Sequence, residues 1–226
     1  MQYKKSIYDV RVGAQALKIE TFTDLDQTID ELCASLPEGS SSDPLSEDLC
    51  PYFGVVWPAA LGLGKKLQRI KDELVGKEIL EIGCGLAIPS FIVTKLGGHI
   101  TASDFHFDVE PFLKINQSLN DLHFPYLRMN WREPIQATSK RYDYVIGSDI
   151  LYESRHANEV AEALLKFVKP GGKIILADPG RSYLQNFVSA MNSLGYTELL
   201  ESISVVDKDQ NRDIYLLSFI VTKNAN

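Results

Sequence analysis

Apolar and polar residues alternate at the start of the chain and then change to a helical spacing. The stretch SIYDVRVGAQALKIETF alternates on both sides of a glycine-containing turn, which predicts a β-hairpin. Apolar residues then recur at helical spacing from Leu25 to Leu36, with Asp24 as a cap, so a helix is expected. The next stretch, PEGSSSDPLSED, has no periodicity and is rich in Gly, Ser, Pro and acids, which predicts a mobile loop.

From residue 58 onward, strand patterns alternate with helix patterns. The expected helices cover residues 58–72, 88–95, 109–122, 157–168 and 182–195, and KPGG ends the fourth of them. The expected strands cover residues 77–82, 99–104, 126–129, 142–149 and 173–179. This alternation predicts a parallel sheet with helices on both faces and right-handed crossovers.

The last segment breaks the alternation. TELLESISVVDKDQNRDIYLLSFIVTK contains two strand-like runs joined by a short polar turn, with no helix between them. Such runs must pair as an antiparallel hairpin, because a parallel connection needs a long crossover. We therefore expect a three-layer, Rossmann-like α/β fold whose seven-stranded sheet is mostly parallel with an antiparallel last strand. The hairpin, helix and loop of residues 1–50 form an extension, and residues 51–226 form the main domain.

Composition narrows the class of protein. With 226 residues, 45% hydrophobic and 23% charged, the chain is expected to be one large soluble globular protein. A net charge of −7 argues against an enzyme with a broad basic face for nucleic acid. Cys33, Cys50 and Cys84 form no CxxC pair, so free thiols in a reducing compartment are expected. Without a signal peptide or an apolar run of membrane-spanning length, we expect a cytoplasmic protein with no membrane partner.

The stretch GKEILEIGCGLAIPS carries the strongest chemical signal. Gly83 and Gly85 lie between a strand and a helix, where a ligand can approach the backbone. A dinucleotide fingerprint requires a third glycine at position 88, which is Ile, and the Glu81 carboxylate would repel a pyrophosphate. That carboxylate suits a cationic group, and Asp104, which ends the next strand, is placed to accept hydrogen bonds from ribose. A ribose with a cationic tail and no phosphate describes S-adenosylmethionine better than NAD.

Four stretches together resemble a known family. LEIGCGLAIPS, TASDF, YDYVIGSDILYE and PYFGVVWPAALGLGKKL are similar to the seven-strand (class I) S-adenosylmethionine-dependent methyltransferases. The narrower resemblance is to the branch that contains protein lysine methyltransferases and bacterial nicotinamide-N-methyltransferase-like proteins, and it covers residues 50–222. It implies an enzyme that uses S-adenosyl-L-methionine to N-methylate an amine, such as a protein lysine side chain or, alternatively, a small amine.

The resemblance also implies roles for residues around the cofactor. Glu81, Gly83 and Gly85 are expected to hold its methionine part, Asp104 its ribose hydroxyls, and Phe105 to lie beside its adenine.

Further cofactor positions include two departures from the family pattern. Asn130 stands where relatives often have an acid near the adenine amino group, and Ala87 stands where many have a third glycine. Trp131 is expected to flank the adenine ring, Trp57 to reach back over the cofactor, and Ser148 to close the pocket.

Asp149 and Tyr152 correspond to the Asp-x-x-Tyr signature of the family and are the candidate catalytic residues. We hypothesise that Asp149 captures and aims the acceptor amine rather than acting as a strong base. Tyr152 would supply a wall, a hydroxyl bond or cation–π attraction. The structural alternative is that Asp149 caps the next helix and Tyr152 is an ordinary surface aromatic.

The remaining candidates are weaker. Asp178, Pro179 and Arg181 follow the fifth strand, so they either rim the substrate pocket or form a plain turn before a helix. No histidine shares metal-ligand spacing with a Cys or an acid, so no metal is expected, and His106 is the best placed of the four for catalysis.

Three alternatives stay open at this point: a small-molecule N-methyltransferase, an NAD-dependent oxidoreductase, and a non-catalytic cofactor-binding module. The position of residues 1–50 before Trp57 also suggests the hypothesis that they cover the substrate entrance.

Overall fold

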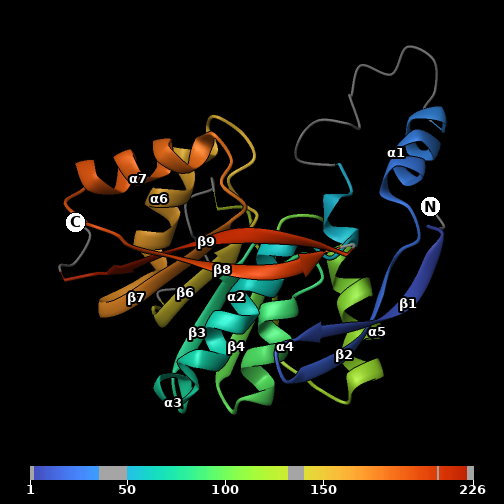
Figure 1. Ribbon diagram of the computed structural model, residues 1–226, viewed down its shortest axis with the longest axis horizontal. Helices are drawn as coiled ribbons and strands as arrows, with labels where there is room; N and C mark the ends of the chain where they lie inside the picture. Colours follow the sequence, from blue (N-terminus) through green and yellow to red (C-terminus); the bar gives the residue numbers. More distant parts are fainter. Residues whose placement is uncertain (1–2, 36–49, 132–139, 208, 223–226) are drawn as a thin grey trace.

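The computed structural model describes residues 3–35, 50–131, 140–207 and 209–222 (Figure 1). The loop expected at 37–48 lies outside the described residues. Within the described ranges, no helix combines the length and the apolar content that a bilayer crossing requires.

The main sheet has seven strands, as the sequence predicts. Their order across the sheet is β5-β4-β3-β6-β7-β9-β8. The bounds are β3 Glu78–Ile82, β4 His99–Asp104, β5 Tyr126–Arg128, β6 Tyr142–Ser148, β7 Val168–Asp178, β8 Leu199–Asp207 and β9 Gln210–Ile220. The strands from β5 to β7 pair in parallel, and β9 pairs antiparallel with both β7 and β8. Because β4 and β6 lie on opposite sides of β3, the strand order reverses there, which is where doubly wound sheets bind ligands.

Helices cover both faces of this sheet. On one face lie α2 (Pro58–Arg69), α4 (Ile88–Lys95) and α5 (Val109–Asn120), and on the other lie α6 (His156–Phe167) and α7 (Tyr183–Ser193) (Figure 1). Alternate residues of β3 serve the two faces: Ile79 belongs to the core under α2 and α4, and Leu80 belongs to the core under α6. The three-layer prediction is confirmed.

Two boundaries differ from the expected ones by three residues or more. The helix expected at 58–72 ends at Arg69, because Ile70 leaves helical geometry (φ −104°, ψ 20°) before the short helix α3 (Lys71–Leu74) begins. Strand β7 starts directly after α6 instead of at residue 173. The KPGG stretch is therefore part of the strand, and the main-chain N–H of Gly171 donates to the Val221 carbonyl at 2.6 Å.

The N-terminal hairpin and helix also form as expected. Strands β1 (Lys5–Val12) and β2 (Gln15–Phe22) pair antiparallel, and α1 (Leu25–Ala34) is capped by Asp24, whose side chain accepts the Gln27 N–H at 2.9 Å. The inner face of the hairpin packs on α5, where the Asn116 side chain bonds both the N–H and the carbonyl of Glu20. Four side chains of the hairpin join the core under α2 and α4: Val12, Leu17, Ile19 and Phe22. The division at residue 50 stays a prediction.

Candidate active site

A cavity of about 290 Å³ lies at the carboxyl ends of β3, β4 and β6, where the strand order reverses. The structure brings most of the expected site residues together in its lining. Those that line it are Trp57, Gly83, Gly85, Asp104, Phe105, Asn130, Trp131, Ser148, Asp149 and Tyr152.

The turn after β3 requires its glycines. Gly83 and Gly85 have φ values of 58° and 49°, in the left-handed region that disfavours other residues. A Cβ on Gly83 would lie 2.6 Å from the Ile150 side chain, and one on Gly85 would lie 3.2 Å from the Phe53 carbonyl oxygen. Ala87 has φ 57°, so this chain places a methyl group where glycine would be less strained.

Asp104 is held at the cavity by main-chain donors. Its Oδ2 accepts the N–H of Gly85 at 2.9 Å, and its Oδ1 accepts the N–H of His106 at 3.0 Å. Burial raises the pKa of this carboxyl, and the two main-chain donors lower it in part. Since each carboxylate oxygen can accept a second hydrogen bond, Asp104 retains capacity for a ligand hydroxyl.

Glu81 does not line the cavity among the described residues, which differs from the position expected for it. It is fully buried on the same face of β3 as Ile79, beneath α4. Its Oε2 accepts the Ser90 N–H at 3.0 Å and the Ser90 hydroxyl, and its Oε1 has no hydrogen-bond partner among the described residues. Burial raises the pKa of Glu81 to about 8, although the bonds from Ser90 lower it in part. The hydrogen bonds of Glu81 therefore go to the first turn of α4.

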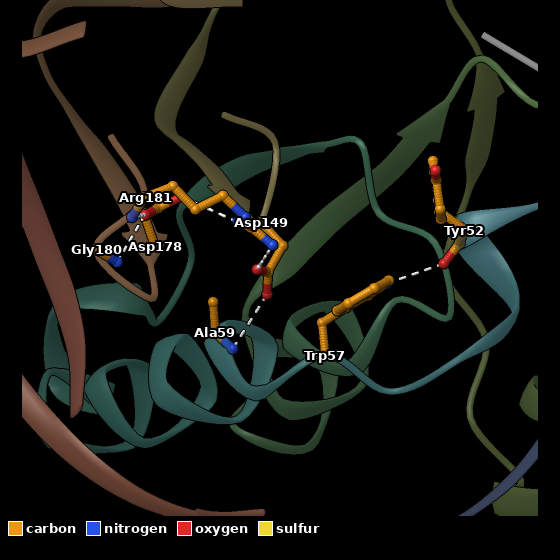
Figure 2. A network of polar contacts seen from close by, with 7 residues as sticks. All are labelled: Tyr52, Trp57, Ala59, Asp149, Asp178, Gly180 and Arg181. Carbon is orange, nitrogen blue, oxygen red and sulfur yellow. Dashed lines mark hydrogen bonds and ion pairs between the residues drawn. The ribbon is translucent and has the colours of Figure 1, made fainter. Parts of the chain in front are cut away.

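Asp149 is the centre of a polar network (Figure 2). Its Oδ2 accepts the N–H of Ala59 at 3.1 Å, and its Oδ1 pairs with the Arg181 guanidinium at 2.7 Å. Arg181 also pairs with Asp178 at 3.1 Å. Burial raises the pKa of Asp149, and Arg181 lowers it.

This network explains the Trp-Pro start of α2. Pro58 occupies the first turn of α2, and Ala59 beside it has a main-chain N–H with no acceptor inside the helix. Asp149 accepts that N–H, so it does cap a helix, although the helix is α2 and not the next one in the chain. The contact fixes the start of α2 relative to the end of β6.

Three aromatic side chains of the cavity lining pack on one another and form an aromatic rim: Tyr52, Trp57 and Tyr152. The indole N–H of Trp57 donates to the Tyr52 carbonyl at 2.9 Å (Figure 2). The Tyr52 ring centroid lies 6.4 Å from that of Trp57 and 6.0 Å from that of Tyr152. Tyr52 and Tyr152 remain 39% and 38% exposed, so their rings are accessible. Sequence reasoning missed Tyr52, although it lies within the stretch PYFGVVWP that the resemblance used.

Two histidines also line the cavity. His156, which sequence reasoning did not assign, packs edge-on against Tyr152 at 4.6 Å, and its Nε2 lies 3.4 Å from a carboxylate oxygen of Glu153. His106, the best placed candidate from sequence, packs its ring on Phe53 at 4.5 Å. In the part of the chain that the structure describes, no three His, Cys, Asp or Glu side chains are grouped to hold a metal ion.

The cavity fits a nucleoside. Asp104 can accept ribose hydroxyls, and Phe105 and Trp131 provide aromatic walls. The buried indole N–H of Trp131 has no partner among the described residues, so a donor is available for a ligand. The seven-strand sheet, the glycine turn and this cavity together define a class I S-adenosylmethionine-dependent methyltransferase.

Comparison with known proteins narrows the class to a family. A family model described as lysine methyltransferase matches residues 49–193, so the chain belongs to the lysine methyltransferase family. Family membership makes the chain a methyltransferase (EC 2.1.1) and excludes the oxidoreductase alternative.

Individual relatives resemble parts of this chain, and solved structures share its fold. Protein N-lysine methyltransferase METTL21A of Xenopus tropicalis is 27% identical over 167 residues, which cover 72% of this chain and 74% of that protein. EEF1A lysine methyltransferase 3 of the same organism is 30% identical over 99 residues, 43% of this chain and 44% of that protein. The chain therefore spans less than half of some curated relatives. A 16S rRNA methyltransferase of T. thermophilus, solved with AdoMet and guanosine, shares the fold with a TM-score of 0.62 at 13% identity, over 96% of this chain and 51% of that one.

Proposed function

We propose that this protein transfers a methyl group from S-adenosylmethionine to the side-chain amine of a lysine in a protein substrate. The observation that carries the proposal is the division of the cavity into two chemically different halves. One half is a glycine turn and a carboxylate held by main-chain N–H groups. The other is an exposed aromatic rim beside a carboxylate that is already paired with arginine.

The cofactor belongs in the main-chain half. Gly83 and Gly85 allow its methionine part to lie against the backbone, and Asp104 accepts its ribose hydroxyls. When bound, the cofactor supplies a methyl group on a sulfonium, which is already activated for displacement.

Side chains from four segments complete this half. Phe105 and Trp131 flank the adenine, and the Asn130 side chain accepts from its amino group. Trp57 and Ser148 close the pocket over the cofactor. Glu81 supports this half without contacting the cofactor, because its bonds to Ser90 fix the first turn of α4.

The acceptor enters between Tyr52 and Tyr152. A lysine ammonium is attracted to the faces of aromatic rings, and these two rings are accessible at the mouth of the cavity. The nitrogen must lose its proton before it attacks. With a free pKa of about 10.4, neutrality near pH 7 requires about 4 to 5 kcal/mol. Burial and the adjacent sulfonium both lower the lysine pKa.

The pairing of Asp149 with Arg181 refines its expected role. A free carboxylate would hold the ammonium in its charged form, but the guanidinium at 2.7 Å offsets that negative charge. We therefore assign Asp149 as a positioning residue that holds Arg181 in the acceptor half and fixes the start of α2. Tyr152 is the residue that contacts the acceptor.

Methyl transfer from a radiolabelled cofactor into fractionated cell lysate tests this function. The expected result is label in a protein band, at a residue that mass spectrometry identifies as methylated lysine. Asp104→Ala serves as the inactive control, and Asp9→Ala, on the exposed outer side of the hairpin, serves as the active one. Label confined to small molecules, or to a side chain other than lysine, would contradict the proposal.

A further inference from the structure

We propose that the N-terminal hairpin, together with Tyr3 just before it, contributes to cofactor binding. Phe22 and Tyr3 hold in position two segments that face the cofactor. The segments are the 3-10 turn η1 (Tyr52–Gly54) and the loop from Asp104 to Asp108. The family match begins at residue 49, so the hairpin lies outside the part of the chain that defines the family. The inference rests on the proposed function, which places the cofactor in the cavity.

The first connection is apolar. Phe22, at the end of β2 and 2% exposed, has its ring 5.4 Å from that of Phe53 and 5.3 Å from that of Phe112. It also packs directly on the main chain of η1, since a Cβ on Gly54 would lie 2.1 Å from the Phe22 ring. The Tyr3 ring covers Phe22 at 4.7 Å. The hairpin therefore fixes where Phe53 lies.

Phe53 links the hairpin to the cavity. It lines the cavity, and its carbonyl oxygen approaches Gly85 so closely that a Cβ there would lie only 3.2 Å away. Its ring packs on His106 at 4.5 Å. A shift of Phe53 would disturb the glycine turn and the residues after Asp104 together, because interiors are close-packed.

The second connection is polar and leads from Tyr3 to the carboxylate of Asp104. The Tyr3 hydroxyl donates to Asp108 Oδ2 at 2.6 Å, and the Asp108 N–H donates to His106 Nδ1 at 3.1 Å. The His106 N–H donates in turn to Asp104 Oδ1 at 3.0 Å. Burial and the bond to Asp108 raise the pKa of Tyr3, so its hydroxyl stays a donor at neutral pH.

The consequence concerns affinity for the cofactor rather than the methyl-transfer step. If the hairpin holds η1 and the Asp104–Asp108 loop in the binding conformation, weakening it lowers the fraction of molecules that can bind. The apparent Kd then rises by the inverse of that fraction. Saturating cofactor selects the competent conformation, so kcat is expected to stay within about twofold.

Calorimetric titration with S-adenosylhomocysteine tests the proposal on the 226-residue chain. Phe22→Leu is expected to raise Kd by about tenfold and Tyr3→Phe by about threefold. The matched control is Phe187→Leu, which alters an equally buried phenylalanine in the core under α6 and α7. Its Kd should stay within about twofold of the wild type, even where its melting temperature falls as much as that of Phe22→Leu.

The outcomes separate the two proposals. Wild-type affinity in both Phe22→Leu and Tyr3→Phe would overturn the role of the hairpin. An equal loss of affinity in Phe187→Leu would overturn it too, because binding would then follow overall stability. If Phe22→Leu does not fold, Tyr3→Phe decides, since it removes only a hydroxyl. Failure of the wild type to bind S-adenosylhomocysteine would contradict the proposed function itself.

Discussion

The two halves of the cavity are built from different parts of the polypeptide. In the cofactor half, the main chain does most of the positioning. Gly83 and Gly85 turn the backbone, and the main-chain N–H groups of Gly85 and His106 donate to Asp104. In the acceptor half, side-chain contacts contribute more, since Asp149 pairs with Arg181 in addition to the Ala59 N–H, and Tyr152 is held by packing. A half set by main-chain geometry is fixed by a short motif, whereas a half set by side chains can change with few substitutions. We therefore propose that substrate specificity is determined in the acceptor half.

The largest expected effect concerns Asp104. Asp104→Ala removes the acceptor of two main-chain N–H groups and of the ribose hydroxyls. We expect affinity for S-adenosylhomocysteine to fall at least 100-fold, about 3 kcal/mol, measured by calorimetry. Asp9→Ala should bind like the wild type. Undiminished binding by Asp104→Ala would remove the basis for placing the cofactor in this half.

A second prediction distinguishes the acceptor half of the cavity from the cofactor half. Asp149→Asn weakens the pair with Arg181 but leaves a carbonyl that can accept from Ala59. We expect kcat/KM for the protein acceptor to fall about 30-fold, near 2 kcal/mol, while the cofactor Kd changes less than about threefold. Steady-state kinetics and calorimetry on one preparation measure both. Equal losses in the two quantities would mean that Asp149 belongs to the cofactor half.

Tyr152 sharpens the description of the acceptor half. Tyr152→Ala removes a ring from the exposed rim and should raise the KM of the acceptor about tenfold. Tyr152→Phe keeps the ring and should stay within about threefold. If Phe proves as damaging as Ala, the hydroxyl acts directly and the cation–π argument is wrong.

The smallest expected effect lies in the glycine turn. Ala87 occupies a left-handed conformation at φ 57°, so Ala87→Gly should relieve strain and stabilise the protein by about 1 kcal/mol. Denaturant unfolding measures it, and Gly85→Ala, at φ 49°, provides the opposite control. Destabilisation by Ala87→Gly would show that chain entropy outweighs the strain at this position.

The same division explains what could be predicted from the sequence. The order of helices and strands, the glycine turn and Asp104 follow from local patterns, because each depends on residues close together in the chain. Arg181 beside Asp149, and Tyr52 beside Tyr152, depend on how distant segments meet, which no local pattern specifies. The contact of Phe22 with Phe53 has the same origin.

Glu81 is a different case. The alternation of side chains along β3 places it on the same face as Ile79, so its position beneath α4 could have been inferred from strand periodicity alone. The motif suggested a direct ligand contact instead. The alternation decides where the side chain points.

A crystal structure of the complex with S-adenosylhomocysteine tests the account most directly. We predict that the ribose hydroxyls bond to Asp104, that the homocysteine part follows the Gly83–Gly85 turn, and that the sulfur faces the opening between Tyr52 and Tyr152. A ligand bound elsewhere, or one whose sulfur faces away from that opening, would contradict the division of the cavity into a cofactor half and an acceptor half.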